Sequence, residues 1–216
     1  TNRAVFIAGP RYNSRAGISV AGNVDVDGDG GDDVILGAPF DSSEGKQYNG
    51  SAFIVYSSAI DRGDALLDLA GKGGGTMAQV RGDQSLQFMG QSVAGLGRFD
   101  PNLPGGGTSA LGDDVAIGAP GTSLSGKLLA GAVYVLRGDP GGLDAIYHPG
   151  DFGNSSGSAG VFYLGAATGD QAGWNVAAGG DFIPDANGFT DLILTAPFND
   201  ALGKPDRGAT YVVAGS

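Results

Sequence analysis

The chain has 216 residues, among them 42 Gly and 10 Pro, carries a net charge of −11 and contains no Cys. The Gly and Pro content excludes a helical bundle, and the lack of Cys excludes disulfides and thiolate metal sites. The negative charge, without a basic stripe, argues against nucleic acid or an anionic membrane as a partner and makes metal cations the natural counter-charge.

The acidity comes almost entirely from one residue type. Glu44 is the only Glu among the 23 acidic residues, and Asp favours turns and calcium loops whereas Glu favours helix interiors. No apolar run approaches about 18 residues, so we expect no membrane insertion, and we expect a signal peptide to be absent or removed. The composition predicts a loop-rich protein with a packed core.

The first predicted strands lie in the N-terminal third of the chain. A short strand at residues 5–9 precedes a Gly-x-Ser-Val-Ala-Gly segment at 17–22, and an apolar run that opens on Asp33 ends in the triplet Gly-Ala-Pro at 37–39. A Gly-led β-rich segment follows at 50–56, and another short strand is predicted at 78–82. Short apolar runs bounded by Gly, Asp and Pro are typical of buried strands that end in turns.

The same pattern recurs twice further along the chain. The Gly-led segments are spaced by 81 and then 77 residues, and the corresponding strands lie at 90–95, 114–119, 131–136 and 161–165, then at 173–178, 191–196 and 208–213. Four short antiparallel strands per repeat, without a helical period, predict a β-propeller blade. We therefore expect an all-β chain that forms one propeller segment over 1–216, with approximate repeats at 10–82, 83–165 and 166–216 plus the strand at 3–9.

The third repeat lacks its fourth strand, whereas one strand precedes the first repeat. The N-terminal strand at 3–9 is thus available to complete the last blade of the same or a neighbouring chain. Three blades are fewer than the usual 4–8. We expect either further repeats of a longer chain or a homo-oligomer that assembles by donating this strand.

An acidic loop joins the first two strands of the first repeat. Asp25, Asp27, Asp29 and Asp33 occupy positions 1, 3, 5 and 9 of this loop, and Gly31 offers a backbone carbonyl at position 7. Oxygen ligands in this spacing can surround one hard cation, and the number of protein oxygens favours Ca²⁺ over Mg²⁺. Four carboxylates within nine residues would repel one another without a cation.

The loop differs from an EF-hand in two respects. An EF-hand needs Glu at position 12, where this chain has Leu36, and it needs flanking helices where the pattern predicts strands. The sequence therefore predicts a calcium loop between strands.

The motifs of the first repeat resemble the FG-GAP repeats of integrin alpha-chain β-propellers. The resemblance rests on Gly-x-Ser-Val-Ala-Gly, Asp-x-Asp-x-Asp-Gly-x-x-Asp, Asp-Val-Ile-Leu-Gly-Ala-Pro and Gly-x-Ala-Phe-Ile-Val-Tyr, and the Phe-Met-Gly segment at 88–90 is more similar to bacterial secreted and surface members. It covers nearly the whole chain and is most specific in the first repeat. The first repeat departs from the family at 15–16, where Arg-Ala stands in place of an aromatic residue.

The resemblance implies a non-enzymatic, calcium-binding propeller module of an extracellular or cell-surface protein, in which calcium acts as a structural staple in adhesion or assembly. In the first loop the family pattern assigns the side chains of Asp25, Asp27, Asp29 and Asp33 and the carbonyl of Gly31 as ligands. A possible ligand of such a module is an extracellular protein or a glycan, and no nucleic acid is implied.

The other two loops match the pattern less closely. In the third repeat Asp185, Asn187 and Asp191 keep positions 3, 5 and 9, while Asp181 stands two residues too early and requires a bulged loop. The second repeat offers Asp100, Asn102 and Asp114 as candidate ligands around a Pro/Gly-rich insertion. We expect calcium at the first loop and at the third, and the second is either a further calcium site or an incomplete one.

Several features leave alternatives open. Arg-Gly-Asp occurs at 62–64, 81–83 and 137–139, either as adhesive tripeptides or as turns. Trp174, Phe162 and Tyr163 suggest a sugar-stacking platform or packing between blades.

The single His148 and the absence of Cys leave no zinc site or usual nucleophile-base pair. The alternative functions are a carbohydrate- or protein-binding propeller and a hydrolase accessory domain.

Overall fold

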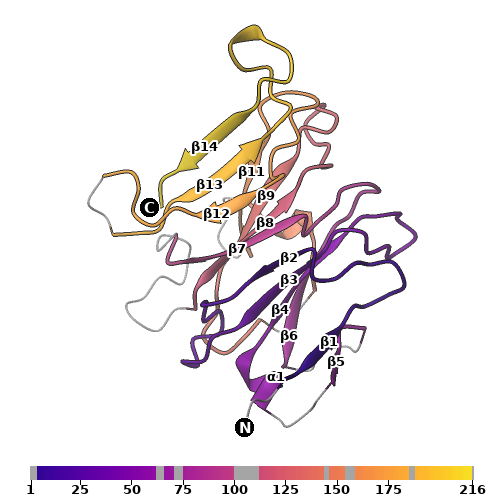
Figure 1. The fold of residues 1–216 in the computed structure, drawn as a ribbon, viewed down its shortest axis with the longest axis vertical. Helices are drawn as coiled ribbons and strands as arrows, with labels where there is room; N and C mark the ends of the chain where they lie inside the picture. The colour runs from indigo at the N-terminus through magenta and orange to yellow at the C-terminus, as the bar shows by residue number, and fades with distance from the viewer. Residues whose placement is uncertain are drawn as a thin grey trace.

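The computed structural model describes residues 4–61, 66–70, 75–99, 112–143, 146–153, 159–184 and 188–215. In these residues fourteen strands form four separate sheets, and none of the sheets closes on itself (Figure 1). The all-β prediction is confirmed. The helical elements are short, namely α1 (Ser57–Asp61) and two 3₁₀ turns at Pro149–Asp151 and Ala201–Gly203. No helix in the described ranges has the length and apolarity needed to cross a membrane.

The first sheet contains the strands of the first repeat in chain order. β2 (Ser19–Ala21), β3 (Val34–Ala38), β4 (Ser51–Val55) and β6 (Met77–Arg81) pair as antiparallel neighbours. A fifth strand, β10 (Ile146–Tyr147), adds parallel to the outer edge of β6. Because β10 comes from the second repeat, it links the second repeat to the edge of the sheet that the first repeat forms. We call this five-stranded group sheet 1.

Sheets 2 and 3 repeat the same order. Sheet 2 contains β7 (Ser92–Gly97), β8 (Asp114–Ala119), β9 (Ala132–Leu136) and β11 (Gly160–Leu164), all antiparallel. Sheet 3 contains only three strands, which are β12 (Val176–Ala178), β13 (Leu192–Ala196) and β14 (Ala209–Val213). The strands that the sequence pattern placed in one repeat therefore lie side by side in one sheet.

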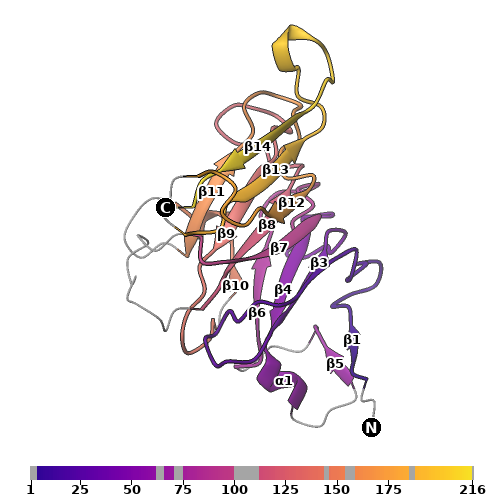
Figure 2. The ribbon, with the colours of Figure 1, turned by 60° about the vertical axis from the view of Figure 1, so that its left-hand side comes forward.

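The N-terminal strand has a partner that the sequence did not predict. β1 (Phe6–Ala8) pairs in parallel with β5 (Leu66–Asp68), which lies in the connection between β4 and β6. β1 and β14 lie at opposite ends of the molecule (Figures 1 and 2). The expectation that the first strand completes the last blade of the same chain is therefore not met here.

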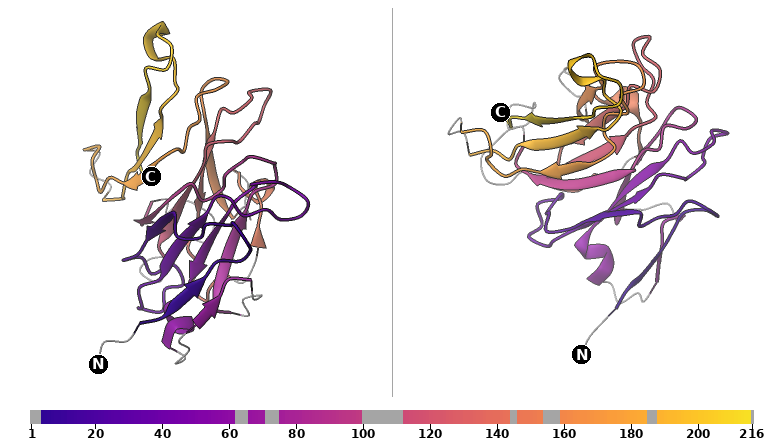
Figure 3. Two further views of the ribbon diagram at one scale, coloured as in Figure 1. Left: turned by 45° about the vertical axis from the view of Figure 1, so that its right-hand side comes forward. Right: turned by 45° about the horizontal axis from the view of Figure 1, so that its top comes forward.

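The three large sheets are stacked through their inner strands. β7 contacts both β2 and β12, so the inner strands of sheets 1, 2 and 3 follow one another in space (Figure 3). One apolar cluster fills the space between sheets 1 and 2, and a second fills the space between sheets 2 and 3. A third cluster lies on the opposite face of sheet 1, beneath β1, β5 and α1.

The exposed fractions of three equivalent valines show that each sheet is covered by the preceding one. Val93 of β7 and Val176 of β12 are 7% and 8% exposed because each faces the preceding sheet, whereas Val20 of β2 is 63% exposed.

The close approach of one sheet to the next also requires glycine. A Cβ on Gly37 or Gly118 would lie 2.0 Å from a backbone oxygen of the next sheet. The Gly of the Gly-Ala-Pro triplet is thus a requirement of sheet stacking.

Candidate metal centre

The acidic loop between β2 and β3 is anchored by its apolar residues. Val24 and Val26 are fully buried in the cluster between sheets 1 and 2. The N–H of Asp33 donates to the carbonyl of Val24 at 2.7 Å, and the N–H of Asp139 donates to the carbonyl of Val26 at 3.0 Å. Alternating valines therefore turn inward and leave the carboxylates between them to face outward.

Three of the predicted ligands come together in this loop. Asp25, Asp27 and Asp29 each offer a carboxylate oxygen, and these oxygens lie within 4.8 Å of one another. Among the described residues no other group of at least three potential metal-binding side chains has this geometry. Gly28 and Gly30 adopt φ values of 68° and 89°, a conformation that favours glycine and lets the chain curl around the carboxylates.

Backbone N–H groups hold the carboxylates in place. The N–H of Asp29 donates to Oδ1 of Asp25 at 3.1 Å and to Oδ1 of Asp27 at 3.3 Å. The N–H of Gly30 donates to Oδ2 of Asp25 at 3.0 Å, and that of Gly31 donates to Oδ1 of Asp29 at 2.7 Å. The triad is therefore organised by the loop itself and presents oxygen atoms only, the ligand type that calcium prefers.

The electrostatics of the loop favour a positive ion. Burial raises the pKa of Asp27, with the charges of Asp29 and Asp25 acting in the same direction. Burial also raises the pKa of Asp33 to about 6, with added repulsion from Asp27 and Asp25, although two backbone N–H groups oppose the shift. Ionised carboxylates at these positions are costly on their own, and a cation would remove that cost.

Asp33 has a structural role in addition to its predicted role as a ligand. Its side chain is 1% exposed, and its two carboxylate oxygens accept the N–H groups of Val26 and Ser57, each at 2.8 Å. Val34 at the start of β3 pairs with Val55 at the end of β4, so Asp33 and Ser57 lie at the same end of the sheet and Asp33 connects the acidic loop to the end of β4. Its oxygens keep lone pairs for a cation, but Asp33 is not part of the group of three.

In each of the other two sheets, one buried Asp likewise accepts backbone N–H groups from two separate segments with its two carboxylate oxygens. In sheet 2, Asp114 accepts the N–H of Phe99 and the N–H of Gly138, both at 3.1 Å. In sheet 3, Asp191 accepts N–H groups from Phe182 and Ile183 with one oxygen and from Gly215 with the other. We call this arrangement the carboxylate bridge; it was missed at the sequence level, although the Asp that opens each apolar run was its signal.

A second link that the sequence did not reveal ties the first loop to sheet 2. The N–H of Asp25 donates to Oδ2 of Asp113 at 3.0 Å, and the N–H of Asp113 donates to the carbonyl of Asp25 at 2.7 Å. Asp113 stands immediately before β8. Order in the acidic loop is therefore coupled to the joint between sheets 1 and 2.

The other predicted ligands cannot be placed as sets. Asp100, Asn102, Asp185 and Asn187 lie outside the described residues. Asp181 is exposed, whereas Asp114 and Asp191 are buried in their carboxylate bridges. The described residues thus bring together predicted ligands in the first loop alone.

The Arg-Gly-Asp segments are engaged in structural contacts where they are described. Nη1 of Arg81 donates to Glu44 at 2.8 Å, and the carbonyl of Gly82 accepts Asn49 at 2.6 Å. Gly138 donates its N–H to a carboxylate bridge. The tripeptide at 62–64 lies outside the described residues.

The three aromatic residues suggested as a platform lie in different contacts. Trp174 makes an edge contact with Phe198. Phe162 stacks on Tyr134, and Tyr163 meets Phe99 edge-on. Phe162 and Tyr163 therefore pack within the stack of sheets rather than beside Trp174. Nε2 of His148 lies 3.9 Å from Oε1 of Glu44, the same carboxylate oxygen that accepts from Arg81.

The fold and the site together define a class, an all-β protein of stacked antiparallel sheets with a carboxylate-lined loop at the joint of the first two. No family model matches the chain. Over 185 residues, or 86% of its length, the chain is 26% identical to the phosphatidylinositol-glycan-specific phospholipase D of Rattus norvegicus. The chain spans 19% of that protein.

Proposed function

We propose that this chain is a calcium-binding, non-enzymatic FG-GAP β-propeller module of a secreted or cell-surface protein, serving adhesion or self-assembly. The observation that carries the proposal is the group of Asp25, Asp27 and Asp29, whose carboxylate oxygens lie within 4.8 Å of one another. Asp33 and the carbonyl of Gly31 are the further ligands in this proposal, and bidentate carboxylates or water would complete the six to eight oxygens that calcium takes.

The contacts around the loop indicate a staple rather than a reaction centre. A bound calcium ion would supply positive charge to the triad. The loop's own residues would then hold the joint, because Val26 is buried between sheets 1 and 2 and Asp25 pairs with Asp113 ahead of β8. Ordering of the loop thus stabilises the stacking of two sheets.

The proposed propeller architecture has independent support. Each large sheet runs from an inner strand outward in chain order, and the inner strands β2, β7 and β12 follow one another. These are the features of consecutive propeller blades. An extracellular location suits a calcium loop of this kind, because calcium loops of extracellular modules have dissociation constants of about 10⁻⁴ to 10⁻³ M.

The experiment is a calcium titration of the whole chain by calorimetry, together with thermal melts in chelator and in calcium. Wild-type protein is expected to bind calcium and to melt at a higher temperature in its presence. Asp27→Asn should remove most of this stabilisation. Asp32→Asn is the matched control, because Asp32 is exposed in the same loop and lies outside the triad. Equal responses of the two variants, or a melt indifferent to calcium, would contradict the proposal.

The similarity to a phospholipase D supports a second candidate, an accessory region of an enzyme of that class. A phospholipase D assay on the chain, alone and added to a catalytic domain, separates this role from adhesion. A third candidate, a carbohydrate- or protein-binding propeller, would be favoured by glycan-array binding without self-association.

A further inference from the structure

We propose that the hairpin between β8 and β9 docks on the surface of a zwitterionic phospholipid bilayer, where its leucines enter the edge of the hydrocarbon and its lysine meets lipid phosphate. We call residues 123–129, Ser-Leu-Ser-Gly-Lys-Leu-Leu, the leucine hairpin. This role goes beyond the calcium staple proposed above and does not depend on it.

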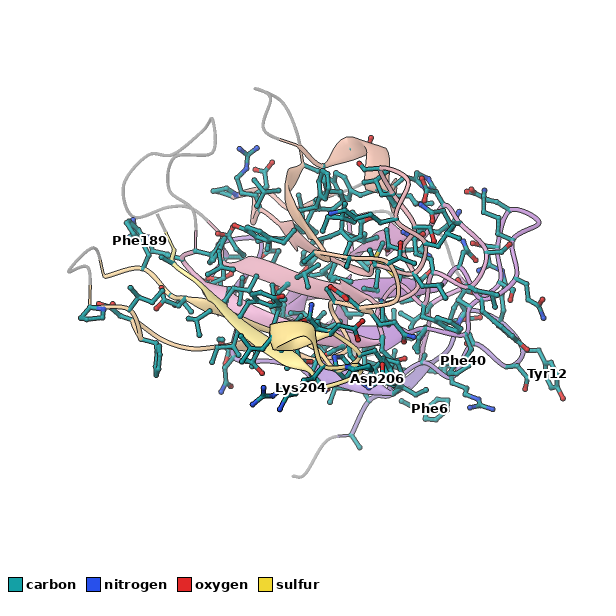
Figure 4. The ribbon with its side chains drawn as sticks, turned by 90° about the horizontal axis from the view of Figure 1, so that it is seen from above. Phe6, Tyr12, Phe40, Phe189, Lys204 and Asp206 are labelled. Carbon is teal, nitrogen blue, oxygen red and sulfur yellow. The ribbon has the colours of Figure 1, made fainter. Side chains whose placement is uncertain are left out.

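The leucine hairpin lies at the end of the sheets that faces away from the acidic loop. The acidic loop precedes β3, whereas the hairpins of sheets 1 and 2 follow β3 and β8. Figure 4 shows this separation, since Phe189, in the loop before β13, and Phe40, in the loop after β3, lie on opposite sides of the molecule. The leucine hairpin, pink in Figure 3, projects beyond the strands of sheet 2, so a flat surface can reach it.

Large exposed aliphatic side chains gather at this hairpin. Its three leucines are 39%, 66% and 45% exposed at positions 124, 128 and 129. Leu86, which is 47% exposed, belongs to the neighbouring loop, and that loop accepts the N–H of Ser123 with Oε1 of Gln84 at 2.9 Å. Aliphatic surface of this kind is costly in water, and a cluster of it marks a contact surface.

A second hairpin in the same chain has the same backbone. The hairpin between β3 and β4 lies 81 residues earlier, and an antiparallel bridge joins Ser43 to Lys46 there as it joins Leu124 to Lys127 in the leucine hairpin. The two hairpins can therefore be compared position by position.

The comparison shows that the fold does not require leucine at these positions. Ser43 and Gln47 stand where the leucine hairpin has Leu124 and Leu128. A polar side chain thus fits each of these two positions of the shared backbone. The leucines are available for a contact outside the chain.

The backbone of the leucine hairpin is already hydrogen-bonded within the protein. Leu124 and Lys127 each donate the N–H to the carbonyl of the other, at 3.2 and 3.0 Å. The carbonyls of Leu128 and Leu129 accept N–H groups from the loop at 169–171, at 2.9 and 3.1 Å. Backbone polar groups enter an apolar medium cheaply only when they are paired. The hairpin can therefore leave water without losing these bonds.

Lys127 carries the only charge of the leucine hairpin. Its Nζ lies 3.4 Å from the carbonyl oxygen of Gly165, and within the described ranges it forms no ion pair. The equivalent Lys46 does pair, with Glu44 at 3.5 Å. An ammonium group beside aliphatic side chains can extend to the headgroup level while the leucines lie deeper.

These features fit a bilayer better than a protein groove. The cores of protein interfaces are rich in aromatic residues and Arg, and the leucine hairpin contains neither. The chain's net charge of −11 opposes an anionic surface, so the proposal commits to zwitterionic lipid. Interfacial anchors reach about 5–10 Å into the boundary between headgroups and acyl chains, which requires no membrane-spanning segment.

Flotation of the whole chain with phosphatidylcholine vesicles, in calcium and in chelator, tests the proposal. Wild type should float in both conditions, and Leu128→Gln should lower the vesicle affinity by about tenfold or more. Because Gln47 occupies the same backbone position, this variant should keep the wild-type melting temperature. Phe182→Gln is the matched control, since Phe182 is also 66% exposed but lies in the loop before β13.

Three results of this experiment would overturn the proposal. They are wild-type protein that does not float, equal losses in the two variants, and binding that appears only with calcium, which would place the contact at the acidic loop. Sedimentation velocity without vesicles adds a fourth. Self-association of wild type that Leu128→Gln abolishes would assign the leucines to a protein contact instead.

A label at the tip of the hairpin tests insertion directly. The chain has no Cys, so Ser125→Cys can carry an environment-sensitive fluorophore. In phosphatidylcholine vesicles its emission should shift to the blue and be quenched by spin labels on the acyl chains. Ala178→Cys is the control, because Ala178 is exposed at the end of β12. An unshifted label at 125, or an equal shift at 178, would contradict docking through the leucine hairpin.

Two further comparisons test the role of Lys127 and the choice of lipid. Lys127→Gln should also weaken flotation, and replacing part of the phosphatidylcholine by phosphatidylserine should not strengthen it. Binding that is indifferent to Lys127→Gln would remove the lysine from the contact, and binding that requires phosphatidylserine would contradict the zwitterionic surface.

Discussion

At the scale of single residues, the buried aspartates have two tasks that compete. Asp33, Asp114 and Asp191 each accept backbone N–H groups from two segments of their own sheet. Asp33 also lies beside the acidic triad, whose charges help raise its pKa. Asp33 therefore links two segments of sheet 1, and its protonation also depends on the charge of the neighbouring triad.

The carboxylate bridge should be worth more than an ordinary surface interaction. In Asp191→Asn an amide group replaces one carboxylate oxygen, which leaves a buried N–H of Gly215 or of the 182–183 segment without its acceptor. We expect a loss of about 2 kcal/mol in the free energy of unfolding. Urea denaturation in chelator measures it, with Asp32→Asn as the control for the lost charge. A loss no larger than in the control would show that the bridge is not stabilising.

Without calcium, the protein should be more stable at mildly acidic pH than at neutral pH. The pKa of Asp33 is raised to about 6 from its ordinary value of 3.8, so the folded state binds more protons than the unfolded state between these values. Linkage then makes the free energy of unfolding fall as pH rises through this interval. The pKa of Asp191 is lowered, mainly by the N–H of Ile183, so its contribution is lost only under more acidic conditions.

The measurement is urea denaturation in chelator at about pH 5 and pH 7. Wild type should have the higher midpoint at the lower pH, and Asp33→Asn should show a smaller difference. Saturating calcium should reduce the effect in wild type, because a cation favours the ionised form. A midpoint that rises from the lower to the higher pH in chelator would contradict this account.

At the scale of elements, the regular strands followed from local pattern and the added strands did not. β3, β4, β8, β9, β13 and β14 are apolar runs that open on Asp or Gly, so period and punctuation predicted them. β5 and β10 have three and two residues and lie in connections without a period. β5 pairs with β1 and β10 pairs with β6, both in parallel and with partners far away in sequence, which no local pattern encodes.

The candidate metal site also contains a part that local sequence predicts and a part that only the tertiary structure shows. Asp25, Asp27 and Asp29 were predictable because their spacing is local. The partners of Asp33 and Asp25 were not, because both are distant in sequence. Ser57 meets Asp33 only after β3 and β4 pair, and Asp113 meets Asp25 only after sheets 1 and 2 stack. The sequence thus predicts a ligand list, whereas the coupling of the loop to the joint needs the tertiary structure.

Sheet stacking should fail locally when a Cβ is added to the triplet glycine. In Gly37→Ala the new methyl group would lie 2.0 Å from the carbonyl oxygen of Gly90. The two sheets must then move apart, at a cost of about 2–3 kcal/mol. Gly150→Ala is the control, because a Cβ there meets nothing within 4 Å. Thermal melts of both variants measure the difference, and equal melting temperatures would show that the joint tolerates separation.

At the scale of the whole molecule, stability should decline from the middle of the stack towards sheet 3. The strands β4 and β9 are buried at every residue, since sheets or added strands cover both faces. β14, by contrast, has no buried residue along its length and has one edge unpaired among the described strands. The amides of β14 should therefore open with a smaller free energy than those of β4 and β9.

Hydrogen exchange followed by mass spectrometry tests this gradient. In dilute protein, peptides from 209–213 should exchange well before peptides from 51–55 and 132–136. Uniform exchange of the three strands would contradict the gradient.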